Sequence, residues 1–295
     1  MNRTGPNPLN NPKTRVVAII PTRYESVRLP GKALLEIAGK PMICLVVERA
    51  LASQNVERAI VATDDQRIFA AVESAGYEAV MTREDHASGT DRIAEVAAAL
   101  PDAEIIVNVQ GDEPLISPRT IDRAVAELIN DTRAGIVTTW EPMEFAADVF
   151  NPDIVKIVVD DRGRAGYFSR SPVPYPRDAA RLHGSLAAAL GNDPSLLSHF
   201  RKHTGLYVYR RETLMEFTAW PQSELERLEA LEQLRALAHG VEIKAIEASS
   251  RSIGVDTEED LQRVRAIVEK RSFDFGGFRD PKNESADYTD SADSR

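Results

Sequence analysis

The chain has 295 residues, of which 43% are hydrophobic and 28% are charged, enough for a sizeable core in one large domain or two small ones. Its formal net charge of −10 argues against general nucleic-acid binding, because proteins that bind nucleic acids carry a basic surface. Cys44 is the single cysteine, so no disulfide can form within the chain, and its apolar surroundings predict a buried side chain.

The ends of the chain differ in composition from its middle. Residues 1–13 are rich in Asn and Pro and lack the apolar centre of a signal peptide, and no apolar run reaches the roughly 20 residues that cross a bilayer. We therefore expect a cytoplasmic protein without membrane partners. A single domain is predicted over 15–271, between a disordered N-terminal arm (1–14) and a disordered C-terminal tail (272–295).

The first half of the chain alternates short apolar runs with segments of helical periodicity. The predicted strands are 16–20, 58–63, 78–81 and 104–109, and the predicted helices are 41–53, 66–74, 90–100 and 118–129. This alternation with short connections predicts an α/β fold with a mostly parallel central sheet covered on both faces.

The second half is less regular. The predicted strands are 155–159, 165–168, 203–209 and 241–246, followed by a capped helix over 257–271, and 178–198 is expected to be an exposed loop or short helix. A long helix is predicted over 223–239, where five leucines step by three and spread around the axis, so we expect it to be mostly covered. On such a helix Glu229 and Glu232 share a side, where they face an arginine, a polar ligand or a subunit interface.

The segment Pro21-Thr-Arg-Tyr-Glu-Ser-Val-Arg-Leu-Pro-Gly-Lys32 directly follows the first predicted strand. It places Arg23, Arg28 and Lys32 in one loop of an otherwise acidic chain, and its prolines and glycine restrict the backbone there. In open α/β sheets, ligands bind beyond the carboxyl ends of the strands. The loop therefore predicts a polyanion site, with a nucleoside triphosphate as the ligand, although a surface loop could carry such cations for solubility alone.

Two aspartates stand where a metal ion could be held. Asp112 lies in Gln110-Gly-Asp-Glu-Pro114, just past a predicted strand, and the motif reads equally well as a turn or as a Mg²⁺ site. Asp256 precedes a helix whose capping box, Thr257 with Asp260, leaves it unexplained, and a plain surface turn is the alternative. His203 and Tyr207, taken alone, read as structural residues of a strand.

These motifs, in this order, resemble one family, the 3-deoxy-D-manno-octulosonate (Kdo) cytidylyltransferases, also called CMP-Kdo synthetases. The opening loop alone would indicate only a sugar nucleotidyltransferase, but the second-half motifs make the resemblance specific. It covers about 15–271. The matching segments are 19–32, 37–43, 61–64, 81–92, 107–114, 167–170, 202–207, 228–235 and 254–257.

The resemblance implies a Rossmann-like nucleotidyltransferase fold with a smaller mixed subregion for substrate binding and dimerisation. It implies that the anomeric hydroxyl of Kdo attacks the α-phosphate of CTP, giving CMP-Kdo and pyrophosphate for lipopolysaccharide biosynthesis. Mg²⁺ is the implied cofactor, CTP and Kdo are the implied substrates, and a homodimer is the implied assembly. No covalent enzyme intermediate is expected, so catalysis consists of positioning and charge neutralisation.

The resemblance also implies residue roles. Asp112 and Asp256 match the metal-binding aspartates, and with Arg23 and Lys32 they form the predicted catalytic set. The predicted nucleotide-binding residues are Pro21, Arg23, Arg28, Lys32, Arg83, Ser88 and Asp112. The predicted sugar-binding residues are Arg92, Gln110, His203, Tyr207, Glu229 and Glu232.

Three alternatives bear on the function. Another CMP-sugar synthetase, acting on 8-amino-Kdo, a sialic acid or a pseudaminic-type acid, would share most of these motifs. A non-catalytic nucleotide-binding protein on the same fold is disfavoured because Arg23, Lys32, Asp112 and Asp256 are all present. A P-loop kinase is disfavoured because Gly31-Lys32 lacks the required preceding glycine and following Ser or Thr.

Overall fold

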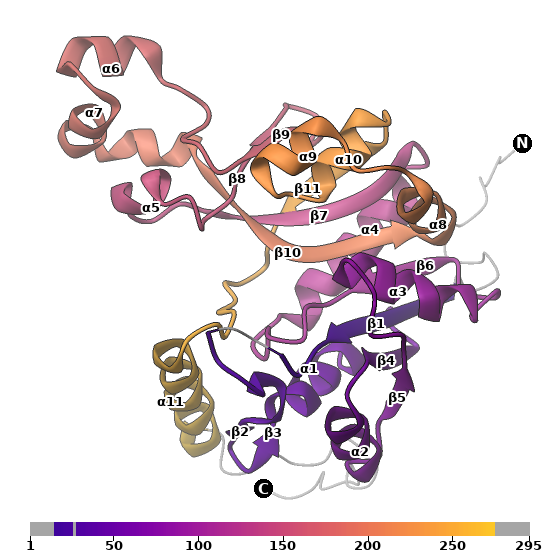
Figure 1. Cartoon of the computed structure of the whole chain (residues 1–295). Helices are drawn as coiled ribbons and strands as arrows, with labels where there is room; N and C mark the ends of the chain where they lie inside the picture. Colours follow the sequence, from indigo (N-terminus) through magenta and orange to yellow (C-terminus); the bar gives the residue numbers. More distant parts are fainter. Residues whose placement is uncertain (1–14, 26–27, 275–295) are drawn as a thin grey trace, which may run out of the picture.

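The computed structural model describes residues 15–25 and 28–274 (Figure 1). The predicted N-terminal arm and residues 275–295 of the predicted tail lie outside the described residues. Residues 272–274, which we assigned to the tail, instead end the last helix, α11 (Glu258–Asp274).

One sheet organises the chain, with the strand order β11-β7-β10-β6-β1-β4-β5. The strands on this path are β1 (Val16–Thr22), β4 (Arg58–Thr63), β5 (Glu78–Met81), β6 (Ile105–Asn108), β7 (Ala134–Pro142), β10 (Arg201–Arg210) and β11 (Glu242–Glu247). A hairpin of β8 (Lys156–Val159) and β9 (Ala165–Ser169) joins the same sheet by pairing with β10. β5, β4, β1 and β6 are parallel, β10 runs antiparallel to both β6 and β7, and β11 is parallel to β7. The predicted α/β fold with a mostly parallel sheet is confirmed, and β10 interrupts the parallel order.

Helices cover both faces of the sheet, and β1 shows why. Ala18 and Ile20 face one core with α1 (Met42–Leu51), α2 (Gln66–Ser74) and α4 (Pro118–Asn130). Val17 and Ile19 face a second core with α3 (Gly89–Ala98), α8 (Arg211–Ala219) and α10 (Gln233–Ala238). A strand buried on both faces has no polar alternation, and this is why β1 is an unbroken apolar run.

A smaller region carries its own core next to the start of β10 (Figure 1). It contains α5 (Ala146–Phe150), α6 (Arg177–His183), α7 (Leu186–Asn192) and the 3₁₀-helix η3 (Pro194–His199). The neighbouring hairpin of β8 and β9 pairs with β10, and its Ile157 and Phe168 pack in the second core of the main sheet. Val149, Leu186, Leu190 and Phe200 are buried together there. The stretch 178–198 is therefore helical through most of its length. Our reading of the sequence also missed β7, α5, α8 and the short hairpin β2 (Glu36–Ile37) with β3 (Lys40–Pro41).

The predicted long helix over 223–239 is wrong. The chain forms α9 (Glu224–Glu229) and α10, separated by Ala230 in the left-handed conformation with φ 51°. Leu225 and Leu228 are 44% and 74% exposed, so the expected covering is also wrong. Leucines that step by three cannot all face one core on a helix of 3.6 residues per turn, and the break lets the later ones pack while the earlier ones face solvent.

A buried ion pair crosses this break. Arg235 of α10 donates to both carboxylate oxygens of Glu226 in α9, at 2.8 and 2.5 Å, and both side chains are almost fully buried. Because the pair is formed from both sides of Ala230, it fixes the angle between the two helices.

Among the described residues, no helix is long and apolar enough to cross a membrane.

Replacing Arg235 with Ala should destabilise the protein by about 3–5 kcal/mol, because it leaves the Glu226 carboxylate buried without its partner. Urea unfolding, followed by circular dichroism, would measure the change. Arg227→Ala, which removes an exposed arginine of α9, is the matched control and should cost less than about 1 kcal/mol. Equal losses in the two variants would contradict a specific role for the buried pair.

Candidate active site

The ammonium group of Lys32 lies at the centre of the candidate site. It stands at the start of the 3₁₀-helix η2 (Lys32–Leu34), and its Nζ donates to Asp112 Oδ2 at 2.5 Å and to Asp256 Oδ1 at 3.0 Å. The structure thus brings together two aspartates from opposite halves of the chain. Burial alone would lower the pKa of Lys32, but the two carboxylates outweigh it and raise the pKa above its ordinary value. Lys32 is therefore a fixed cation.

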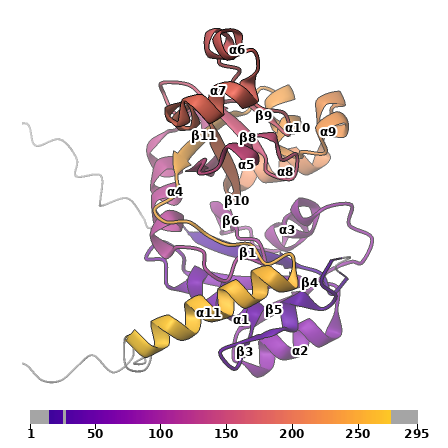
Figure 2. The ribbon, with the colours of Figure 1, turned by 90° about the vertical axis from the view of Figure 1, so that its left-hand side faces the viewer.

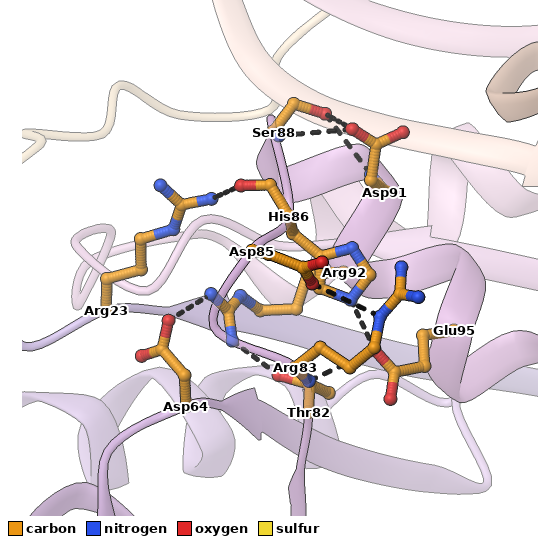
Figure 3. Close-up of polar contacts among 10 residues, drawn as sticks. All are labelled: Arg23, Asp64, Thr82, Arg83, Asp85, His86, Ser88, Asp91, Arg92 and Glu95. Carbon is orange, nitrogen blue, oxygen red and sulfur yellow. Dashed lines mark hydrogen bonds and ion pairs between the residues drawn. The ribbon is translucent and has the colours of Figure 1, made fainter.

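The other two cations of the opening loop lie beside this cluster. Arg28 pairs with Asp256 at 2.9 Å while its side chain stays 61% exposed. Arg23 donates from Nη2 to the backbone carbonyl of His86 at 2.5 Å (Figure 3). Because a carbonyl is uncharged, this contact orients the Arg23 guanidinium without neutralising it, which leaves its charge available to an anionic ligand.

Two glycines let the loops of the site approach one another. A Cβ at Gly111 would overlap Thr22 Oγ1 and lie 3.1 Å from the carbonyl oxygen of Pro21. A Cβ at Gly89 would lie 3.6 Å from the ring of Pro21, so the N-terminus of α3 also packs against the end of β1. The segment 110–114 and the start of α3 therefore both contact Pro21, which places it beside Ser88, the N-cap of α3.

Tyr24 braces the opening loop from the side of α2. Its carbonyl accepts the Gly31 N–H at 3.0 Å, and Gly31 has a φ of 67°, which favours glycine. The Arg67 guanidinium lies over the Tyr24 ring at 3.3 Å from its centre, and Asp65 holds that guanidinium through both oxygens. These contacts fix the two ends of the loop between Arg23 and Lys32.

The segment between β5 and α3 carries the predicted nucleotide-binding residues Arg83 and Ser88 (Figure 3). Arg83 is largely exposed and lies 3.4 Å from Asp85. Ser88 accepts the Asp91 N–H at 3.2 Å and forms a capping box with that residue, so its hydroxyl already has a structural role. The base-recognition roles of Arg83 and Ser88 stay predictions.

Arg92 points away from the other predicted sugar-binding residues. It is 1% exposed, and its guanidinium donates to Asp64 at the end of β4 and to Thr82 at the end of β5 (Figure 3). These contacts give Arg92 a bracing role between two strand ends. From the same helix, Thr90 instead reaches Glu232, its Oγ1 donating to Oε2 at 2.5 Å.

Gln110, His203 and Tyr207 lie together where β10 passes the end of β6. Gln110 Nε2 donates to Asn108 Oδ1 at 3.1 Å and lies 3.5 Å from the carbonyl oxygen of Gly205. The rings of His203 and Tyr207 are 5.4 Å apart between centres. β10 is irregular between residues 204 and 207, where the backbone of Gly205 packs against the Gln110 side chain. Three of the six predicted sugar residues thus form one cluster.

The hydrogen bonds of His203 define its tautomer. Thr138 Oγ1 donates its single proton to the Leu206 carbonyl at 2.9 Å, so it must accept from His203 Nε2, which lies 2.9 Å away. Nδ1 of His203 is therefore left unprotonated and can accept a ligand hydroxyl. Burial lowers the pKa of His203 to about 3, so the ring is neutral at physiological pH.

Glu229 and Glu232 do not share a side, because the helix between them is broken. Glu232 lies beside Thr90, and its charge helps to raise the pKa of buried Tyr207, although burial is the main cause. Glu229 accepts from Ser169 Oγ at 2.7 Å and from the Arg170 N–H at 2.9 Å, so it anchors the end of β9. Glu232 is thus close to Tyr207. The hydrogen-bond partners of Glu229, Ser169 and Arg170, are at the end of β9 instead.

Sequence reasoning missed several residues that shape this site. Thr138 and Ser252 carry no motif signal, because single hydroxyl residues are common on strands and loops. Thr90 lies in the matching segment 81–92, but we assigned it no role. Glu113 had a signal, its place in the segment 110–114, from which we assigned roles to Gln110 and Asp112 but none to Glu113. Burial raises the pKa of Glu113 to about 7, and the charges of Asp112 and Glu141 act in the same direction.

Asp112 and Asp256 fit a magnesium site. Their oxygens already converge on one positive charge, the Lys32 ammonium. Among the described residues, no group of three or more Asp, Glu, His or Cys side chains could hold a metal. A pair of carboxylates suits Mg²⁺, which takes one or two protein ligands and completes its shell with phosphate oxygens and water.

The half-buried His203 should make the protein acid-sensitive. Its pKa is lower in the folded state than its ordinary value of 6.5, so between pH 6.5 and about 3 the unfolded chain binds a proton that the folded chain rejects. Stability is therefore lost as pH falls through this window, by on the order of a few kcal/mol. Urea unfolding at pH 7 and pH 4.5 should show a smaller loss for His203→Gln than for the wild type. His199→Gln, at an exposed position, should match the wild type, and equal losses in all three proteins would contradict the assignment.

The site belongs to a chain with many relatives. The family profile described as cytidylyltransferase matches residues 17–243. A 3-deoxy-manno-octulosonate cytidylyltransferase of Trichlorobacter lovleyi is 49% identical over 251 residues, covering 85% of this chain and 97% of the relative. One of Pseudomonas fluorescens is 50% identical over 255 residues, with the same coverage.

Solved structures agree with these relatives. The structure of a CMP:2-keto-3-deoxy-manno-octonic acid synthetase complexed with CTP is similar with a TM-score of 0.78 and 42% identity, covering 87% of this chain and 99% of that one. A cytidylyltransferase from Leptospira borgpetersenii, at 16% identity and a TM-score of 0.55, shares the fold. The predicted nucleotidyltransferase fold is thereby confirmed, and the chain belongs to the 3-deoxy-manno-octulosonate cytidylyltransferase family.

Proposed function

We propose that this protein transfers CMP from CTP to Kdo, giving CMP-Kdo and pyrophosphate, as a step of lipopolysaccharide biosynthesis in the cytoplasm. The anomeric oxygen of Kdo forms a bond to the α-phosphorus and loses its proton, while the bond from that phosphorus to pyrophosphate breaks. The observation that carries the proposal is the position of Lys32 between Asp112 and Asp256, next to Arg23 and Arg28, in a chain of this family.

The cations of the opening loop bind the triphosphate in this proposal. Arg23, Arg28 and Lys32 come from one segment whose ends Tyr24 and Gly31 hold together, so their charges are placed before the ligand arrives. Charge that develops on the leaving pyrophosphate is then met by cations that need little reorganisation. Since no covalent intermediate is required, positioning and charge neutralisation supply the catalysis.

Asp112 and Asp256 would hold Mg²⁺, which when bound neutralises charge on the phosphates that react. The two carboxylates currently face Lys32, whose raised pKa keeps it protonated. Asp112 and Asp256 therefore have a second task, holding the Lys32 ammonium at the place where the triphosphate is to be bound.

Kdo would bind along β10. His203 offers the bare Nδ1 as an acceptor, Tyr207 a hydroxyl and Gln110 an amide, and Glu232 adds a carboxylate acceptor for sugar hydroxyls. Glu229 would contribute at the edge of this cluster. The Kdo carboxylate needs a cationic donor, and Arg92 keeps that assignment as a prediction even though its guanidinium is engaged by Asp64 and Thr82.

A homodimer formed through the smaller region is part of the proposal. The surface that supports it carries large apolar side chains, with Phe145 63%, Tyr175 60% and Leu182 80% exposed. Large apolar side chains that are exposed on a folded protein are candidates for an interface. Sedimentation at several protein concentrations would measure the state of assembly.

Incubating the purified protein with CTP, Kdo and Mg²⁺ should release pyrophosphate, measured by a coupled colour assay. Asp112→Asn should abolish this release while leaving the circular dichroism spectrum unchanged, because Asp112 lies in a loop outside the two cores. No release by the wild type would refute the activity. Faster turnover with 8-amino-Kdo, a sialic acid or a pseudaminic-type acid would reassign the sugar.

Glu232→Gln should raise the KM for Kdo roughly tenfold and leave the KM for CTP nearly unchanged, because a charged acceptor for sugar hydroxyls is replaced by a neutral amide. Steady-state kinetics with each substrate varied in turn would measure both constants. Glu229→Gln is the matched comparison and should lower the melting temperature more than it changes Kdo kinetics. Unchanged Kdo kinetics in Glu232→Gln, together with lower thermal stability, would make Glu232 a structural residue.

A further inference from the structure

The segment that delivers Asp256 to the site is neither helix nor strand. Residues 248–257, which we call the 248–257 linker, connect β11 to α11 as an irregular segment on the outside of the ribbon (Figures 1 and 2). Regular backbone ladders cannot set the position of such a segment, so specific contacts must do so. The position of Asp256 depends on those contacts.

Two carboxylates from different elements hold one residue of this linker. Glu141, at the end of β7, accepts the backbone N–H of Ser252 at Oε1, 3.0 Å away. Glu113, one residue after Asp112, accepts the Ser252 hydroxyl at Oε2. Ser252 thus donates hydrogen bonds to these carboxyl groups from both its main chain and its side chain.

The chain beyond Ser252 runs directly against the same loop. A Cβ at Gly254 would lie 3.3 Å from Glu113 Oε1, so only a glycine lets the linker pass this close without displacement. The Val255 N–H then donates to the Asp112 carbonyl at 2.9 Å, and the Val255 carbonyl accepts from Lys32 Nζ at 3.2 Å. Asp256 follows immediately.

Placing Glu113 and Glu141 side by side lowers the stability of the fold. Glu141 is 4% exposed, and the nearest cation, Lys202, is 3.8 Å from its carboxylate, so Glu141 lacks a close ionic partner among the described residues. Burying two acidic groups side by side costs free energy, which apolar side chains of similar size would avoid. What the two acids achieve here is a fixed path for the linker.

We propose that Glu113 and Glu141 are positioning residues of the reaction. Their hydrogen bonds to Ser252 fix the 248–257 linker and so hold Asp256 beside Asp112 and Lys32. The inference rests on the proposed function, because it assigns these residues to the geometry of the magnesium and triphosphate site. Neither residue needs to touch a substrate.

Ser252→Ala and Glu113→Ala test the inference, with Ser250→Ala as the matched control. Ser250 lies in the same linker, and its side chain forms no hydrogen bond within the described part of the chain. In the protein without substrates, hydrogen–deuterium exchange of the linker amides should be roughly tenfold faster in both test variants and unchanged in the control. The Mg²⁺ concentration for half-maximal turnover should also rise roughly tenfold, as is common when a residue that orients a metal ligand is removed.

Glu113→Gln keeps an oxygen acceptor for the Ser252 hydroxyl, so it should restore wild-type exchange and stay within about threefold of wild-type turnover. It also serves as the second test should Glu113→Ala fail to fold.

Wild-type exchange rates in Ser252→Ala would overturn the inference. The exchange measurement needs neither CTP nor Kdo. A wild-type protein that releases no pyrophosphate would therefore refute the proposed function, while the exchange rates would still decide whether Ser252 holds the linker.

Discussion

The contact of the Lys32 ammonium with Asp112 and Asp256 is the interaction on which the rest of the site depends. It joins three segments that are remote in the chain: the loop after β1, the loop after β6 and the 248–257 linker. The cations of the loop after β1 would repel one another without the two aspartates, and the two aspartates would repel each other without Lys32. Cations and carboxylates therefore have to assemble together, and the pair of aspartates fixes the position of the Lys32 ammonium at the proposed triphosphate site.

The parallel strands and the antiparallel strand β10 each bring different residues to the same edge of the sheet. β1 and β6 are parallel neighbours, so their carboxyl ends meet at one edge and bring the opening loop against the segment 110–114. β10 runs the other way beside β6, so residues near its start lie at that same edge. Gln110 therefore lies against Gly205 of the strand that also carries His203 and Tyr207, so the proposed nucleotide and sugar sites share one border.

Much of this site could be anticipated because its signals are local. A cation-rich loop after an apolar strand, and an aspartate just past another strand, follow from the rule that ligands bind at the carboxyl ends of strands. The same local reasoning failed over 223–239, where periodicity suggested one helix. The Glu226–Arg235 pair and the left-handed Ala230 outweigh helix propensity there, and neither is visible without the tertiary fold.

By itself, the sequence determined the α/β class, the cation-rich loop and, through the order of its motifs, the family. These properties depend on short stretches whose periodicity and composition are independent of distant contacts. Only the tertiary structure decided that Asp112 and Asp256 meet at Lys32, that Arg92 is committed to Asp64 and Thr82, and that Glu229 and Glu232 have separate surroundings. The physical reason is that a side chain's partners are set by which strand ends and loops the sheet order brings together, and residues far apart in the chain carry no local sign of that meeting.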